Sequence, residues 1–410
     1  MKKCRACGHT LKAAFLSLGS SPLSNSYLSP QMLSAMEPFY PLDVYVCEKC
    51  FLVQLEEFEK ARNIFDSLYA YFSSYSDSWL AHCRAYVDMM MKRFAIDKSW
   101  FVVELASNDG YLLQYFKKRC IPILGIEPAE NTANEARKKG IPTDAVYFTE
   151  HYAKQLSGAG KSADLIIANN VLAHNPDIND FTAGIAALLK PDGIVTVEFP
   201  HVLSMFANNE FDTIYHEHYS YLSLLTVQKL FASHGLAVFD VEELPTHGGS
   251  LRVFAKPAGS AKNKVAESVA RVIAKENAAG LFSVETYGRF RAHVEKVKRE
   301  LLLFLIAQKK AGKTVAGYGA PAKANTLLNY CGIRTDLLEY TVDRSPHKQG
   351  KFLPGTHIPI FSPEKIRETK PDYVLILPWN IQEEIILQMA HIKEWGGKFV
   401  VAIPEMKIFE

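Results

Sequence analysis

The chain has 410 residues, of which 48% are hydrophobic and 22% are charged, and its formal net charge is +2. This length predicts two or three domains, and the composition excludes a disordered, collagen-like or coiled-coil protein. The near-neutral charge argues against a dedicated nucleic-acid-binding protein, whose affinity depends on a basic surface. The sequence has no apolar run of about 18 residues and no secretory signal at its start, so we expect a cytoplasmic protein with no membrane partner.

The first candidate site consists of two C-x-x-C pairs, Cys4 with Cys7 and Cys47 with Cys50. In a reducing compartment such pairs indicate metal ligands before they indicate disulfides. Four thiolates complete the tetrahedron that zinc prefers and leave no position for a substrate, so we expect a structural zinc ion. Two disulfides, or unrelated thiols, are the alternative. We predict a small zinc-binding domain over residues 1–68.

After an amphipathic segment over residues 62–93, apolar strands alternate with helices. Strands are predicted over residues 101–107, 122–127, 164–170 and 194–199, and helices over residues 111–118, 131–139 and 181–189. Continuous apolar strands separated by helices are typical of a parallel sheet that is covered on both faces, and ligands bind at the carboxyl ends of such strands. We predict a domain of this α/β class over residues 69–258.

The loop Glu104–Gly110 (ELASNDG) follows the first of these strands and leads into a helix. Such a turn directs backbone N–H groups at a ligand, but this one has a single glycine and does not fit the G-x-G-x-x-G pattern. Glu127 ends the next strand, about 20 residues further on, where a carboxylate can accept hydrogen bonds from both ribose hydroxyls. The alternative is a helix cap at Asn108 or Asp109 together with a solvated Glu127.

Two later elements favour S-adenosylmethionine (SAM) as the ligand of this loop. The motif NNVLAH follows the third strand, and Pro191-Asp192-Gly193 precedes the fourth. This order resembles that of a class I SAM-dependent methyltransferase. The resemblance implies a cofactor site made of Glu104, Ala106, Asn108, Asp109, Gly110, Glu127, Asn169 and Asn170.

The segment Tyr215–Tyr221 (YHEHYSY) has the highest density of reactive side chains, with two histidines, one carboxylate and three phenols. These groups offer a base near neutral pH, an orienting carboxylate and hydroxyl donors. In an extended chain His216 and His218 point in opposite directions, so only one of them can face a given substrate. Their spacing is not the i, i+4 pair of a helical zinc site. A surface loop with satisfied histidines is the alternative.

A second alternation of strands and helices follows two helices predicted over residues 262–277 and 285–310. Its strands are predicted over residues 314–320, 338–343, 373–378 and 399–404, with a helix over residues 321–330. The loop GYGAPA (residues 317–322) fits the G-x-G-x-x-G/A pattern, and Asp343 ends the next strand. This pattern supports an alternative function, an NAD-dependent nucleotide-sugar oxidoreductase. We predict a second Rossmann-like α/β domain over residues 259–410.

Taken together, the motifs resemble the zinc-containing, SAM-dependent sugar C-methyltransferase family. They match in order over nearly the whole chain: the two cysteine pairs, ELASNDG, NNVLAH, FDTIYHEHYSYLS, THGGSLR and GYGAPAKANTLL. The resemblance implies methyl transfer from SAM to a carbon, usually C3, of a nucleotide-linked 4-keto-deoxysugar, in deoxysugar, polysaccharide or natural-product biosynthesis. It also implies a zinc-binding domain, a central class I methyltransferase domain and a C-terminal domain that contributes to nucleotide-sugar binding.

The resemblance assigns roles residue by residue. The family's base falls on His218, and its active-site tyrosine and glutamate fall on Tyr215 and Glu217. His174 and Tyr69 are implied to stabilise an oxyanion or to relay a proton. The implied substrate-binding residues are Tyr71, His247, Ser250, Arg252, Gly319, Ala320 and Lys323.

For two of these residues, Lys323 and Arg252, the chemistry of the side chain bears on the implied role. Lys323 and the N-terminus of its helix suit the diphosphate of a nucleotide, because an ammonium and a helix dipole both favour anions. For Arg252 a surface or interdomain ion pair is an equally good explanation. A non-catalytic nucleotide-sugar-binding protein is a third class, against which the YHEHYSY segment argues. We expect a monomer, since three domains can close a site within one chain.

Overall fold

The computed structural model describes residues 2–60 and 72–409, and the chain forms two compact units. Unit 1 comprises Met1–Leu11, Cys47–His201 and Tyr219–Phe282, and unit 2 comprises Lys12–Val46, Val202–His218 and Ser283–Glu410. Each unit is therefore assembled from three separate stretches of chain. The domain boundaries expected after residues 68 and 258 remain predictions.

Unit 1 is built on a seven-stranded sheet with the order β10-β11-β8-β7-β4-β5-β6. Its strands are β4 (Val102–Leu105), β5 (Ile123–Ile126), β6 (Thr143–Asp144), β7 (Ala163–Asn169), β8 (Leu189–Pro200), β10 (Leu236–Leu244) and β11 (Ser250–Pro257). The strands from β4 to β8 run parallel, and the strand order reverses between β4 and β7. Such a switch point leaves a crevice for ligands at the carboxyl ends of the strands.

The sheet of unit 1 is mixed, whereas the sequence predicted parallel strands only. Strands β10 and β11 pair antiparallel with each other, and β11 pairs antiparallel with β8. The two strands are joined by a short connection that contains the 3₁₀ turn Thr246–Gly248. Adjacent strands with a short connection pair antiparallel, because a parallel pair needs a longer crossover.

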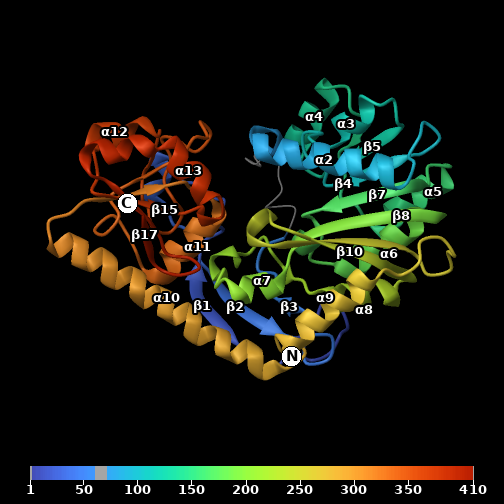
Figure 1. Ribbon diagram of the computed structural model, residues 1–410, viewed down its shortest axis with the longest axis horizontal. Helices are drawn as coiled ribbons and strands as arrows, with labels where there is room; N and C mark the ends of the chain where they lie inside the picture. Colours follow the sequence, from blue (N-terminus) through green and yellow to red (C-terminus); the bar gives the residue numbers. More distant parts are fainter. Residues whose placement is uncertain (1, 61–71, 410) are drawn as a thin grey trace. The chain divides into compact units, whose positions relative to one another are not determined.

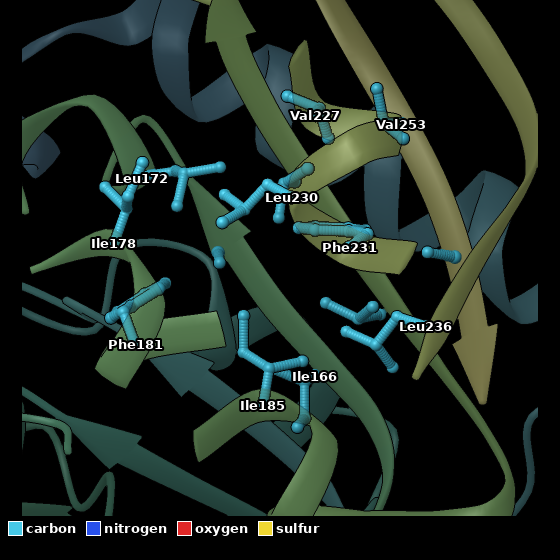
Figure 2. Close-up of a cluster of buried hydrophobic side chains, with 14 of the residues drawn as sticks. Ile166, Leu172, Ile178, Phe181, Ile185, Val227, Leu230, Phe231, Leu236 and Val253 are labelled. Atoms are coloured by element: carbon cyan, nitrogen blue, oxygen red, sulfur yellow. The ribbon is translucent and has the colours of Figure 1, made fainter. Parts of the chain in front are cut away.

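Helices cover both faces of this sheet, as predicted (Figure 1). One face is covered by α2 (Asp77–Arg93), α3 (Leu113–Lys117) and α4 (Glu130–Lys138), and the other by α5 (Glu150–Gly158), α6 (Ile178–Leu188), α8 (Leu224–Ser233) and α9 (Glu267–Ala278). Successive residues along a strand enter opposite cores: Val102 packs toward α2 and α3, and Val103 toward α5 and α6. In Figure 2, Ile166 of β7 lies among apolar side chains of α6 and α8.

The N-terminal cysteine segment belongs to the same unit and shares its core. Strand β3 (Val53–Gln54) pairs antiparallel with β9 (Ser220–Tyr221). Cys4, Cys47 and Leu52 are buried in the core that α8 also enters. The hydroxyl of Thr226 on α8 donates to the main-chain oxygen of Cys50 at 3.2 Å. The cysteine turns are therefore fixed against α8, a helix that covers the seven-stranded sheet.

Unit 2 contains a six-stranded sheet with the order β14-β13-β12-β15-β16-β17. Its strands are β12 (Val315–Tyr318), β13 (Thr341–Val342), β14 (Ile360–Phe361), β15 (Tyr373–Ile376), β16 (Lys398–Val401) and β17 (Lys407–Phe409). All pairs are parallel except β16 with β17. The same unit contains the antiparallel pair of β1 (Leu16–Ser21) with β2 (Tyr40–Val46).

The helices of unit 2 are α7 (Val202–Ala207), α10 (Val284–Lys310), α11 (Ala322–Cys331), α12 (Glu364–Thr369) and α13 (Gln382–Gln388). Of these, α10 and α11 correspond to the helices that the sequence predicted over residues 285–310 and 321–330. Helix α11 follows the GYGAPA loop and begins directly after Pro321, a residue whose fixed φ suits a helix start. Of the helices that the structure describes, none combines the length and the apolar character needed to cross a bilayer.

Candidate active site

The four paired cysteines lie together in unit 1. Their sulfur atoms are all within 4.8 Å of one another, and the Cys4–Cys50 and Cys7–Cys47 sulfurs are each 3.5 Å apart. A tetrahedral zinc site with Zn–S bonds of about 2.3 Å places its sulfurs about 3.8 Å apart. All seven cysteines are in the described part of the chain, and none of them forms a disulfide. The disulfide alternative is therefore wrong, and the spacing fits zinc.

Neighbouring groups orient the first of these thiols for metal binding. The amide of Gln54 donates to the sulfur of Cys4 at 3.3 Å, and Gln54 accepts from the backbone N–H of Arg5 at 2.9 Å. The pKa of Cys4 is lowered to about 4, first because the thiol of Cys50 donates a hydrogen bond to it. The thiolate is the form that binds a metal, and outer-shell donors of this kind fix its direction.

In the ELASNDG loop, at the end of β4, alternate residues adopt the left-handed backbone conformation with positive φ. Ala106, Asn108 and Gly110 have φ of 54°, 48° and 77°. A Cβ at Gly110 would lie 2.3 Å from Cδ1 of Ile141, so only glycine fits there. The side-chain oxygen of Asn108 accepts from the backbone N–H of Ser73 at 3.0 Å. These constraints give the loop one shape before any ligand binds.

Glu127, at the end of β5, is part of the same arrangement. Its two carboxylate oxygens accept from the backbone N–H groups of Asn108 and Ala129, each at 2.9 Å. The side chain is 4% exposed, and burial raises the pKa of Glu127. It is therefore not solvated, and each oxygen keeps a second lone pair that can accept from a ribose hydroxyl. Helix α3 begins only at Leu113, without a side-chain cap, so the helix-cap alternative is wrong as well.

Several buried polar atoms at the ends of β4 and β7 have no hydrogen-bond partner among the described residues. They are both side-chain amide atoms of Asn169, Oδ1 of Asn170 and Oδ1 of Asp109. The other oxygen of Asp109 pairs with the ammonium of Lys139 at 2.9 Å. An unsatisfied buried polar group costs about 1–3 kcal/mol, and such groups are typical of a place where a ligand completes the hydrogen bonds. The residues thus fit a polar cofactor at the switch point.

Glu104 is even less exposed than Asp109 and Asn169. Its side chain is 1% exposed, and burial raises the pKa of Glu104 well above its usual range, with a hydrogen bond from Tyr111 as a smaller opposing effect. The structure places His174 in the 3₁₀ turn Leu172–His174 that follows β7, where it is half-buried. Tyr69 and Tyr71, two further predicted site residues, lie outside the described residues.

The YHEHYSY segment begins in unit 2 as a turn and not as an extended chain. The backbone N–H of His218 donates to the oxygen of Tyr215 at 2.9 Å and closes the turn. Nδ1 of His218 lies 2.9 Å from the main-chain oxygen of Thr213. A carbonyl can only accept, so Nδ1 carries the proton and Nε2 carries the lone pair of the neutral ring. The ring of Tyr215 packs on this imidazole at 4.0 Å between centroids.

The other histidine of the turn has a structural role. His216 is buried, and its Nε2 donates to the main-chain oxygen of Pro41 at 3.1 Å. The edge of its ring meets the ring of Tyr40 at 5.8 Å. Burial lowers the pKa of His216, which keeps the ring neutral. The two histidines do face different partners, as predicted, but a turn separates them and not the pleat of a strand.

Glu217 does not orient a histidine through any hydrogen bond that we observe. Its side chain is 3% exposed, and both of its oxygens accept from the amide nitrogen of Asn25, at 2.7 and 2.9 Å. Burial raises the pKa of Glu217 to about 7, and the Asn25 hydrogen bonds act in the opposite direction. The sequence carries no signal for Asn25, because the segment SPLSNSYL around it has the composition of an ordinary turn.

The THGGSLR motif lies in unit 1, at β11. His247 has a φ of 57° and packs edge-on against Trp79 at 5.4 Å. Ser250 donates to the main-chain oxygen of Thr246 at 2.9 Å. Arg252 is 5% exposed and donates to Glu198 at 2.6 Å and to Glu242 at 2.7 Å. The geometry thus favours an ion pair for Arg252, but a buried one within unit 1 and not the surface or interdomain pair that the sequence suggested.

The GYGAPA loop lies in unit 2, between β12 and α11. Gly319 has a φ of 92°, and a Cβ there would lie 2.5 Å from Cδ of Pro378. Asp343 accepts from the backbone N–H of Ala320 at 2.7 Å. Lys323, on the first turn of α11, donates to Asn380 at 2.7 Å and lies over the ring of Trp379 at 4.4 Å. One carboxylate oxygen of Asp343 thus fixes the loop, as the carboxylate of Glu127 does in unit 1.

The sheet order, the switch point and the buried polar atoms at the ends of β4 and β7 define a Rossmann-like methyltransferase domain with a closed four-cysteine metal site. Three family models match the chain: a zinc binding domain over residues 4–65, a methyltransferase domain over residues 81–241 and a C-methyltransferase C-terminal domain over residues 245–404. The C-methyltransferase NovU of Streptomyces niveus is 39% identical over 409 residues, which cover 99% of this chain and 96% of that protein. The chain belongs to this family of C-methyltransferases.

Solved structures are similar to part of the chain at low identity. The magnesium protoporphyrin IX methyltransferase of Synechocystis PCC 6803 with bound SAM is 14% identical, with 43% of this chain and 78% of that chain covered and a TM-score of 0.33. The PH0226 protein of Pyrococcus horikoshii OT3 is 15% identical, with 49% and 99% covered and a TM-score of 0.38. Similarities of this size bear on neither substrate nor mechanism.

The chain is therefore a SAM-dependent methyltransferase with a zinc-binding domain, and SAM and structural zinc are its cofactors. The cysteines Cys4, Cys7, Cys47 and Cys50, which the sequence predicted as metal ligands, lie close enough together to hold the ion. No match supports the alternative function of an NAD-dependent oxidoreductase, for which the GYGAPA loop was the argument.

Proposed function

We propose that the chain transfers the methyl group of SAM to C3 of a nucleotide-linked 4-keto-deoxysugar, by way of an enolate. The observation that carries the proposal is the imidazole of His218, whose Nδ1–H is tied to Thr213 so that Nε2 is the basic nitrogen. The motif resemblance that extends over nearly the whole chain supports the sugar substrate. We also propose that the enzyme works as a cytoplasmic monomer on this small molecule.

The chemistry requires a base more than it requires any other group. SAM, when bound, supplies a methyl group on a sulfonium, which is already a strong electrophile. A sugar carbon becomes a nucleophile only when its proton is removed, and a neighbouring ketone makes that proton acidic. His218 takes the C3 proton on Nε2 and leaves the electron pair on C3. SAM, when bound, would supply the methyl carbon for the new bond, and its sulfur would keep the electrons of the bond that breaks. A positioned base of this kind contributes about 10²–10⁴-fold in rate.

The remaining residues are proposed to hold the groups around this step. Tyr215, which packs on the imidazole, and Glu217 position the base or the sugar. His174 and Tyr69 stabilise the enolate oxygen or relay a proton, since preorganised donors act where charge develops. The residues proposed to bind the nucleotide sugar are Tyr71, His247, Ser250, Arg252, Gly319, Ala320 and Lys323. Among these, Lys323 and the first turn of α11 suit the diphosphate.

The cofactor residues are proposed from the geometry of the ELASNDG loop. Glu127 accepts the ribose hydroxyls, and Asn169, Asn170 and Asp109 offer the unsatisfied buried atoms. The proposed set is completed by Glu104, Ala106, Asn108 and Gly110, which set the shape of the loop.

A methyl-transfer assay with a panel of 4-keto nucleotide sugars tests the proposed function. We expect SAM-dependent incorporation of one methyl group at C3, located by NMR, with at least one member of the panel. The base and the sugar substitution of the best substrate then follow from the panel. Methylation of a hydroxyl oxygen instead of a ring carbon would contradict the enolate mechanism.

A further inference from the structure

Asn25 and Glu217 form a contact between two residues 192 positions apart in the chain, both within unit 2. The amide nitrogen of Asn25 lies 2.7 Å from one carboxylate oxygen of Glu217 and 2.9 Å from the other. Glu217 is 3% exposed and forms no ion pair within the described residues. A neutral amide therefore takes the place that a cation usually has beside a buried carboxylate.

The chemistry of this contact favours one protonation state of Glu217. An ionised carboxylate accepts hydrogen bonds at both oxygens, whereas a protonated one must present an O–H at one of them. A single amide nitrogen that lies close to both oxygens donates to the charged form and opposes an O–H at either oxygen, so it stabilises the ionised carboxylate against the burial that disfavours it. Among titratable groups, the phenol of Tyr27 on the Asn25 loop interacts with the charge of Glu217, and His216 and His218 are its neighbours in the turn.

The loop that carries Asn25 is fixed by the GYGAPAKAN segment. The buried amide of Asn325 on α11 donates to the main-chain oxygen of Ser24 at 2.6 Å. The hydroxyl of Tyr27 donates to the main-chain oxygen of Ala320 at 2.6 Å. Residues on both sides of Asn25 are thus anchored, Ser24 to helix α11 and Tyr27 to the loop before it, and these anchors hold Asn25 beside the carboxylate.

We propose that Asn25 is a positioning residue of the active site, which clasps both oxygens of Glu217 and thereby holds it ionised in the turn that carries His218. This inference rests on the proposed function, because it assumes that the turn Tyr215–His218 performs the chemistry. An ionised Glu217 places a negative charge in the same turn as the imidazole that becomes positive when it takes the substrate proton. The clasp also connects the GYGAPAKAN loop to the base, although that loop contributes no side chain to Glu217.

The protonation of Glu217 can be read directly in the whole protein. Infrared difference spectra between the wild type and Glu217→Gln, recorded across a pH series, isolate the carboxyl band of this one residue. We expect a midpoint near pH 7 in the wild type. In Asn25→Ala, which removes the donors, we expect the midpoint to rise by about one pH unit. In Asn25→Asp, which has the same shape but adds a second carboxyl group, it should rise further.

Ser26→Ala is the matched control, because Ser26 is the exposed neighbour on the same loop. Its midpoint should equal that of the wild type. Thermal melts of all four variants check that the fold is kept, and Asn25→Asp replaces Asn25→Ala if the latter fails to fold. An unmoved midpoint in the folded Asn25 variants would overturn the clasp.

Catalysis gives the second readout. If the ionised form of Glu217 supports the base, the acidic limb of the profile of kcat against pH moves up by about one pH unit in Asn25→Ala. In a protein that already carries Glu217→Gln, adding Asn25→Ala should produce no such shift. A shift of equal size in that background would contradict the proposal. The infrared titration needs no substrate, so the role of Asn25 and the proposed function can be refuted independently of each other. A moved midpoint without methylation of any 4-keto sugar refutes the proposed function alone, and methylation with an unmoved midpoint refutes the clasp alone.

Discussion

The imidazole of His218 is held by the main-chain oxygen of Thr213, which lies 2.9 Å from Nδ1. A carbonyl fixes the tautomer as firmly as a carboxylate does but adds no full negative charge to the hydrogen bond. The base is therefore oriented by the backbone of its own turn. The charge that compensates the imidazolium has to come from elsewhere, and Glu217, in the same turn, is the group that we propose for it.

The zinc site should be structural and separable from catalysis. We expect Cys4→Ser to lower the zinc content, the folding yield and the melting temperature, since metal binding contributes to folding in small modules with few apolar residues. Cys120→Ser is the control, because Cys120 is an exposed single cysteine. Metal analysis and a thermal melt on both variants decide the point. A Cys4→Ser protein with full zinc content and an unchanged melting temperature would show that the four sulfurs are not the ligands.

Asn169 should matter for cofactor affinity more than for the ligand-free fold. Its amide atoms are buried without a partner among the described residues, so removing them in Asn169→Ala should leave the ligand-free protein as stable or slightly more stable. Affinity for S-adenosylhomocysteine, measured by calorimetry, should fall about 10- to 100-fold, the effect of one or two lost hydrogen bonds. Asn134→Ala, at an exposed position of α4, is the control. Equal affinity in both variants would remove Asn169 from the site.

Arg252 distinguishes an ion pair from a substrate contact. Arg252→Met leaves buried Glu198 with only the imidazole of His82, 3.0 Å away, and breaking a buried pair in this way costs about 3–5 kcal/mol. We expect a large drop in the denaturant midpoint of unfolding. A variant of normal stability with a raised KM for the nucleotide sugar would instead support the substrate-binding role that the motif implied.

Stability should fall as the pH rises from about 4.5 to about 7. Burial raises the pKa of Glu217 and Glu210 to about 7 and that of Asp212 to about 6, while the unfolded chain releases these protons near pH 4 to 4.5. Between these values the folded state binds more protons, so each group stabilises it at low pH and loses that contribution as the pH passes its folded pKa. For Glu217 the change is about 3 kcal/mol at most.

Urea titrations at pH 5 and pH 7.5 check this dependence. The wild type should unfold at lower urea concentration at pH 7.5, and Glu217→Gln, which cannot ionise, should show a smaller difference between the two pH values. A wild-type stability that rises over this range would contradict the direction. Activity is expected to rise over the same range, because the ionised form of Glu217 supports the base, so the site gains function where the fold loses stability.

Local sequence patterns predicted much of the fold. The apolar runs at residues 101–107 and 164–170 are β4 and β7, and the helix expected over residues 285–310 is α10, Val284–Lys310. The paired cysteines indicated their metal because a C-x-x-C turn fixes the geometry of both ligands locally. Each of these features depends on residues that are near one another in the chain.

Contacts between distant segments were not predictable in the same way. Arg252 and Glu198 are directly opposite each other on β11 and β8, and only the antiparallel register reveals that pairing. Asn25 reaches Glu217 across 192 positions, and no spacing or composition signals it. The turn at Tyr215–His218 was taken for an extended chain, because alternating polar and aromatic residues suit either conformation.

The most direct test of the account is hydrogen–deuterium exchange at C3 of a 4-keto nucleotide sugar that the enzyme methylates. The sugar is incubated with enzyme and S-adenosylhomocysteine in D₂O, so that the proton can leave but no methyl group can transfer, and the C3 signal is followed by NMR. We expect the wild type and His151→Asn, an exposed histidine on α5, to exchange this proton, and His218→Asn to exchange it at least 100-fold more slowly with unchanged binding of S-adenosylhomocysteine. Exchange by His218→Asn at the wild-type rate would contradict the assignment of the base.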